Sequence, residues 1–170
     1  MPTAPLTPGP PTPGPTSAPE SLHTPGVERV YPLLRRGRRP EPFPTIYYLR
    51  DPVLVHAMSE LERQGHTQRF QQRLDHDPAL RRRLHDDHAQ YRSRRWDMLT
   101  PEDRRLIRGA PSLGRAFRTG VAGVANFDRI NCLHAHSAHH LVQRPAGGTL
   151  IGQLIDAALE QLPLPRDFDA

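Results

Sequence analysis

The residue types best suited to bind a metal ion are concentrated in one short stretch, "CLHAHSAHH", at residues 132–140. It holds the only cysteine of the chain and four of its ten histidines. The surrounding sequence predicts a helix over 128–143, because Pro145 opposes continuation of a helix beyond that point. We therefore predict a histidine-rich helix, and its faces decide which side chains can act together.

The spacing Cys-x3-His-x2-His places three donor side chains on one stripe of that helix. At about 100° per residue, Cys132, His136 and His139 lie on the same side, with His140 at the edge. His134 instead falls in an apolar sector. A thiolate and two imidazoles suit zinc, or iron as a second choice. We predict that Cys132, His136 and His139 bind zinc or iron.

A second predicted helix, over residues 79–99, supplies a candidate fourth ligand. Its inward stripe has helical period and includes Leu84, His88, Tyr91 and Arg95, so His88 is the histidine expected to face the site. No acid has a spacing that identifies it as a general base, so catalytic residues and enzymatic activity stay open. The side chains expected to surround the metal, without binding it, are His134, His140, Tyr91, Tyr47 and Tyr48.

Two alternatives need no metal. Histidines on a helix often pack as neutral, hydrogen-bonded core residues, and a single cysteine often behaves as a small apolar side chain. A Cys132–His136 nucleophile is disfavoured, because activated thiols usually lie at a helix N-terminus rather than in a helix interior. The sequence also has no Cys-x-x-Cys or His-Glu-x-x-His motif, which would identify a metal site more specifically.

Cap chemistry predicts the elements that position these residues. Asp51-Pro52, Asp77-Pro78 and Thr100-Pro101 each place an N-cap acceptor before a proline at the first helical position. Further helices are predicted at "QRFQQRLD" and "LIGQLIDAALEQL", and "FPTIYYL" is the one extended segment. The predicted fold is mostly α, a single compact helical domain of about five or six helices.

Composition divides the chain into three parts. Thirteen of the twenty prolines fall in the first 44 residues, a segment with few large apolar side chains. Such a segment cannot bury enough surface to offset its ordering entropy, so residues 1–42 are predicted to be a disordered tail. The helical domain is predicted at 43–162 and a short C-terminal tail at 163–170.

Charge and cysteine content bear on partners and compartment. All 23 basic residues are arginine and the net charge is +5. In the predicted domain, acids alternate with arginines, as in "RRRLHDDH", which is typical of solvated helix faces; sequence-specific DNA binding is not expected. The tail motif "RRGRR" would attract an acidic protein or another polyanion by charge alone. The alternative function is therefore a non-enzymatic interaction protein or polyanion binder with structural histidines.

The compartment expected for this chain is the cytoplasm. One cysteine cannot form an intramolecular disulfide, and the sequence shows neither a signal peptide nor an apolar stretch long enough to span a membrane.

Several motifs together resemble a bacterial family catalogued as domain of unknown function 501. They are "YYLRDPVLV", "HAQYRSRRW", "GVAGV" and above all "CLHAHSAHHL", spread over roughly residues 44–156. Ala122 and Asn131 depart from the pattern. The resemblance implies small soluble bacterial proteins without an assigned activity. The resemblance also implies genes near those for a septum-formation initiator and an exopolyphosphatase, an association that is compatible with an interaction protein of the division or envelope machinery. The family pattern carries over onto Tyr47, Tyr48, Asp51, Pro52, His88, Tyr91, Gly120, Gly123, Cys132, His134, His136 and His139.

Overall fold

Three of the helices begin at the proline-flanked caps that the sequence predicts. In the computed structural model, which describes residues 23–36 and 39–162, Asp51, Asp77 and Thr100 are the N-caps of α1 (Pro52–Arg63), α3 (Pro78–Asp97) and α4 (Pro101–Gly109). Each cap side chain accepts a hydrogen bond from a backbone N–H of the first turn. The proline that follows has no N–H of its own to leave unpaired, so the two residues together define where each helix starts.

The described part of the chain contains seven α-helices and two 3₁₀ turns, which confirms the mostly α class. The helix that the sequence did not predict is α5, a six-residue helix containing a glycine. Within the described residues, no helix is both long and apolar enough to cross a membrane. The remaining helical elements are α2 (His66–His76), α5 (Pro111–Ala116), η1 (Val121–Gly123), α6 (Leu133–Gln143), η2 (Arg144–Ala146) and α7 (Leu150–Leu159).

Four short strands form two antiparallel pairs. The predicted extended segment contains β4 (Tyr47–Leu49), which pairs with β1 (Val27–Arg29), and β2 (Leu33–Arg36) pairs with β3 (Arg39–Pro42). The first three strands lie within residues 1–42, the segment predicted to be a disordered tail. The part of that tail before residue 23, the C-terminal tail at 163–170 and part of the "RRGRR" motif lie outside the described residues.

A contact with a residue far along the chain holds the segment around β2 in place. Asp103 of α4 is only 4% exposed, and its carboxylate accepts the Tyr31 hydroxyl at 2.6 Å and the Arg35 guanidinium at 2.5 Å. The Tyr31 oxygen in turn accepts the N–H of Thr100 at 3.1 Å. These bonds compensate a buried charge and attach β2 to α4, an effect that local composition does not encode.

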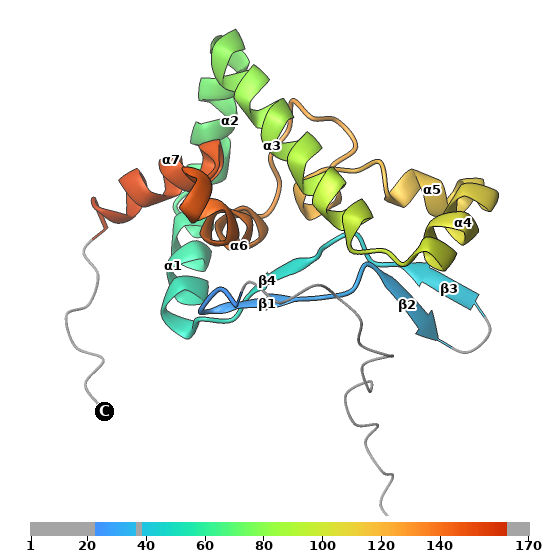
Figure 1. Cartoon of the computed structure of the whole chain (residues 1–170). Helices are drawn as coiled ribbons and strands as arrows, with labels where there is room; N and C mark the ends of the chain where they lie inside the picture. The colour runs from blue at the N-terminus through green and yellow to red at the C-terminus, as the bar shows by residue number, and fades with distance from the viewer. Residues whose placement is uncertain (1–22, 37–38, 163–170) are drawn as a thin grey trace, which may run out of the picture.

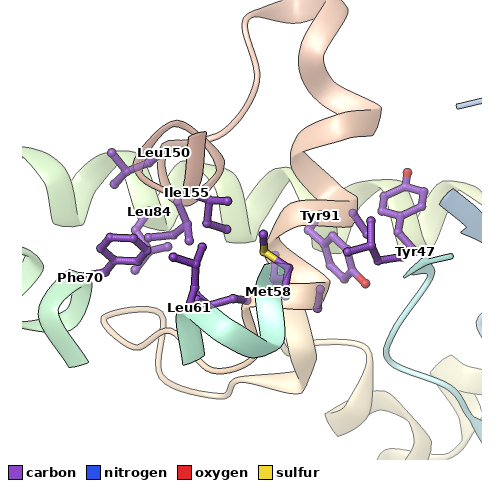
Figure 2. Packing of buried hydrophobic residues seen from close by; sticks show 14 of the residues in the cluster. Tyr47, Met58, Leu61, Phe70, Leu84, Tyr91, Leu150 and Ile155 are labelled. Atoms are coloured by element: carbon purple, nitrogen blue, oxygen red, sulfur yellow. The ribbon is translucent and has the colours of Figure 1, made fainter. Parts of the chain in front are cut away.

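Helix α6 lies at the centre of the larger hydrophobic core. Figure 1 shows it surrounded by α1, α7 and the β1–β4 pair, with α3 running diagonally across the molecule. Apolar side chains of the surrounding helices and of β4 meet there (Figure 2). Those labelled are Tyr47 of β4, Met58 and Leu61 of α1, Phe70 of α2, Leu84 and Tyr91 of α3, and Leu150 and Ile155 of α7.

A buried arginine joins this core to a smaller one. The smaller cluster consists of Leu33, Leu99, Ile107 and Phe117, beneath α4 and α5. Arg95 of α3 is fully buried, and its guanidinium donates to the carbonyl oxygens of Pro44, Phe117 and Thr119 at 2.7, 3.0 and 2.5 Å. Burial lowers its pKa to about 10, which leaves it charged at neutral pH.

Helix α7 can approach α6 only where its residues are small. Gly152 lies against the imidazole of His140, and a Cβ built at Gly152 would overlap that ring. Because His140 is itself buried, the ring has little space to move away. The interface between the two helices therefore requires glycine at this position.

We expect Gly152→Ala to lower the free energy of unfolding by roughly 1–3 kcal/mol through overpacking. Gly109→Ala is the matched control, because no atom lies within 4 Å of a Cβ at that position of α4; it should be neutral or stabilise by up to about 1 kcal/mol. Urea unfolding of both variants measures the difference. Equal stability of the two variants would contradict the described contact between α6 and α7.

Candidate metal centre

Helix α6 begins five residues later than the sequence predicts, and this changes the position of the cysteine. Cys132 is the N-cap, with extended backbone angles, and Leu133 is the first helical residue. Side chains of neighbouring helices bind backbone N–H groups on either side of Cys132. The Gln71 side chain of α2 accepts the Ile130 N–H at 3.1 Å, and Glu62 of α1 accepts the Leu133 N–H at 2.7 Å. The prediction that the cysteine lies inside a helix is therefore wrong.

Three potential ligands converge at this helix end. The Cys132 sulfur lies 3.7 Å from Nδ1 of His134, and that nitrogen lies 3.4 Å from Oε1 of Glu62. One donor atom from each of the three side chains lies within 4.8 Å of the others. Among residues 23–36 and 39–162, no other group of three or more histidine, cysteine and acidic side chains meets this condition. We call these three residues the Glu62–Cys132–His134 group.

Hydrogen bonds to α1 orient the His134 ring. Its Nε2 lies 3.1 Å from the carbonyl oxygen of Val55 and 3.2 Å from the hydroxyl of Ser59, whose own proton goes to the same carbonyl. A carbonyl oxygen can only accept, so Nε2 carries the proton of the neutral ring. Nδ1 then presents its lone pair toward Cys132 and Glu62, as a metal-binding histidine does when its other nitrogen is held by a backbone carbonyl.

Opposing effects act on the Cys132 thiol. Burial raises its pKa, and the neighbouring Glu62 carboxylate acts in the same direction. The nearby backbone N–H groups of Ala135 and His134 lower the pKa but do not outweigh burial. The group thus holds a neutral thiol beside a carboxylate, an arrangement that a cation would stabilise in its deprotonated form.

His88 is buried as predicted, but both of its nitrogens are occupied. Nδ1 accepts the Val121 N–H at 3.0 Å, and Nε2 donates to the Arg129 carbonyl at 3.1 Å. Desolvation lowers its pKa to about 4, so the ring is neutral at neutral pH. Gly120 packs directly on this ring, where a Cβ would overlap it. His88 therefore fixes the η1 turn and has no free lone pair in this structure.

His136 and His139 point into the core and not toward Cys132. His139 is fully buried, stacked on Tyr47 with ring centroids 6.1 Å apart and against the edge of Tyr91 at 5.0 Å. His136 lies against His88 with centroids 5.7 Å apart. Burial lowers the pKa of His136 well below its ordinary value and that of His139 to about 3. Nε2 of His136 and both ring nitrogens of His139 lack a partner among the described residues.

The remaining predicted neighbours are used elsewhere. His140 accepts the Thr149 N–H at Nδ1 and contacts Asp156 through Nε2 at 3.1 Å, which attaches α7 to α6. The Tyr91 hydroxyl accepts the N–H of Ile46 at 2.8 Å, and burial raises the pKa of Tyr91 to about 12. Tyr48 stacks on Phe43 and lies under Arg50.

The structure thus divides the predicted ligand set. Cys132 is brought together with His134, which the sequence analysis placed around the metal, and with Glu62, which it did not single out. His88, His136 and His139 lie in the core, and Cys132 forms no three-ligand group with them among the described residues. Nothing in the sequence identifies Glu62, because it reaches the site only through the packing of α1 against α6, 71 residues away.

A comparison with protein families agrees with the resemblance noted in the sequence. The model of a family described as a protein of unknown function, DUF501, matches residues 18–157. Searches of curated proteins and of solved structures returned no match.

The buried histidines make the folded state sensitive to acid. An unfolded imidazole titrates near pH 6.5, whereas the folded-state pKa values of His88 and His139 are about 4 and about 3. As the pH falls below 6.5, the unfolded chain therefore binds protons that the folded chain does not, and stability present above pH 6.5 is lost. Asp87, whose pKa is raised to about 6 by burial, has the opposite effect but is a single group.

We expect the free energy of unfolding of chelator-treated protein to fall by roughly 3 kcal/mol between about pH 7 and about pH 4.5. Urea unfolding at each pH measures this. His139→Phe removes one titrating group and should flatten the profile, while the exposed control His56→Gln should leave it unchanged. A profile that His139→Phe does not alter would contradict a buried neutral ring at this position.

Proposed function

Because the chain belongs to the DUF501 family, which contributes no assigned activity, we propose its function from side-chain geometry: Glu62, Cys132 and His134 bind a zinc-like metal ion. The observation that carries the proposal is the convergence of three donor atoms of different chemistry within 4.8 Å. These donors come from α1, from the residue before α6 and from its first turn.

The donor set favours a borderline divalent metal. A thiolate, an imidazole and a carboxylate together match Zn²⁺ better than the hard ions Mg²⁺ and Ca²⁺, which take oxygen ligands. Iron remains the second candidate, as the sequence analysis expects. The neutral thiol of Cys132 would lose its proton on binding, and the bound cation would offset the repulsion between the resulting thiolate and the Glu62 carboxylate.

Exposure of the group supports an open rather than a closed site. The side chains of His134 and Glu62 are 27% and 34% exposed, and Cys132 is half-buried. Three protein ligands leave a tetrahedral ion one position for water or a substrate atom, whereas structural zinc sites are usually closed by four protein ligands. This arrangement is the one in which zinc lowers the pKa of a bound water toward neutrality.

Metal titration of single-site variants tests the ligand set. We expect purified protein to bind about one Zn²⁺ or Co²⁺ per chain, with a thiolate-to-cobalt charge-transfer absorption. Cys132→Ser and His134→Ala should each weaken binding at least ~100-fold, and Glu62→Gln at least ~10-fold, because each removes a donor. The measurement is competition with a chromophoric chelator, with circular dichroism to confirm folding.

Matched controls lie on the same helix as Glu62. Glu60→Gln and His56→Ala change the same residue types outside the group and should bind metal as the parent does. Retention of full affinity in His134→Ala, with loss in His136→Ala or His139→Ala, would assign the metal to the stripe predicted from the sequence. Absence of binding in the parent would reject the proposed function.

Metal binding should also release a proton. A thiol that is neutral in the metal-free protein must become a thiolate, so we expect about one proton released per ion near neutral pH. Calorimetric titrations in buffers of different ionisation enthalpy measure this number. Loss of proton release in Cys132→Ser, with residual metal binding at high concentration, is the expected control result. An unchanged release in that variant would show that the sulfur is not a ligand.

A further inference from the structure

A cavity of about 510 Å³ shares no residue with the Glu62–Cys132–His134 group. It is formed by the C-terminal half of α3, by α4 and α5, and by the residues that follow α5. Figure 1 shows these helices gathered at the C-terminal end of α3, beside the β2–β3 pair. The cavity is half open to solvent, so a ligand bound there would keep part of its surface exposed.

Arginines without acidic partners line the cavity. Arg92, Arg108 and Arg118 are all exposed, and within residues 23–36 and 39–162 none of them forms an ion pair with a carboxylate. Asp97 is the one acid in the lining, and it lies near a different arginine, Arg104, at 3.9 Å. The lining therefore carries a net charge of +2, and its guanidinium groups retain donors for an anion.

The other part of the lining is aromatic and apolar. Trp96 is half-buried and packs edge-on against the buried Phe117, with centroids 6.3 Å apart. The guanidinium carbon of Arg108 lies 5.4 Å from the Trp96 centroid, so a cationic group and an aromatic surface adjoin each other. Ile107, also buried, completes this wall. A ligand that fits both parts must combine an anionic group with a flat apolar one.

Guanidinium groups match phosphate better than other common anions, because their planar fork donates two parallel hydrogen bonds. Aromatic and aliphatic side chains match a planar ring. We propose that this cavity binds a phosphorylated small molecule that carries a planar ring, of the nucleoside monophosphate class. Arg108 and Arg118 contact the phosphate, and the ring packs on the exposed part of Trp96, beside the buried Ile107 and Phe117.

The single tryptophan of the chain gives a direct test, because Trp96 lines the cavity and its fluorescence responds to binding there. The full chain is titrated with AMP at constant ionic strength, with adenosine and inorganic phosphate as separate arms, and calorimetry checks each fluorescence change. We expect saturable AMP binding that weakens with added salt. Adenosine and phosphate alone should each bind at least ~10-fold more weakly, since each supplies only part of the interaction.

Charge-matched variants decide whether the cavity is the site. The double variant Arg108→Gln/Arg118→Gln should weaken AMP binding at least ~10-fold. Arg73→Gln/Arg82→Gln removes the same charge from exposed positions on α2 and α3 outside the lining, and should bind AMP as the parent does. Equal loss in both double variants would overturn the proposal, since binding would then follow net charge alone. Absence of saturable AMP binding, or phosphate binding as tight as AMP binding, would overturn it as well.

Discussion

The structure depends on burying a helix that carries four imidazoles. Eight of the eleven residues of α6 are buried, among them His136, His139 and His140. Burial favours the neutral form of the His136 and His139 imidazoles, so the elements around these rings must present apolar or aromatic surfaces. Tyr47 and Tyr91 do this for His139, while the His140 ring accepts the backbone N–H of Thr149.

The burial of imidazole rings also explains why glycine occupies three positions in the core. Gly120 lies on the ring of His88, and Gly148 and Gly152 lie on the ring of His140; at each position a Cβ would overlap the imidazole. At two places in the core, a histidine ring thus packs directly against glycine: His88 against Gly120, and His140 against Gly148 and Gly152. The turn at η1 and the start of α7 are positioned by these contacts, which bring both ends of the segment 120–152 against the central helices.

Arg95 adds a second constraint of the same kind. Its charge is buried without a carboxylate, held by three carbonyl oxygens and lying within 6 Å of the ring centroids of Tyr91 and Phe117. A planar guanidinium can reach three acceptors in different directions, whereas a lysine could not reproduce this fork. The arginine therefore fixes the smaller core to the larger one. By contrast, Arg108 of α4 and Arg118 after α5 are exposed and keep their donors free, so the same residue type has a structural role in α3 and a binding role in our proposal elsewhere.

Local chemistry determined much of the fold from the sequence alone. The Asp-Pro and Thr-Pro pairs start α1, α3 and α4 because cap and proline act within one turn, and the inward stripe of α3 is the predicted one, with Leu84, His88, Tyr91 and Arg95 buried. Periodicity likewise separated His134 from His136 and His139. Tertiary packing decided the rest. Glu62 and Gln71 bind the chain before α6, which delays that helix and makes Cys132 its cap. The convergence of Glu62, Cys132 and His134 depends on the packing of α1 against α6. The residues in contact there are about 71 positions apart in the sequence, and a contact of that range leaves no pattern in the local sequence.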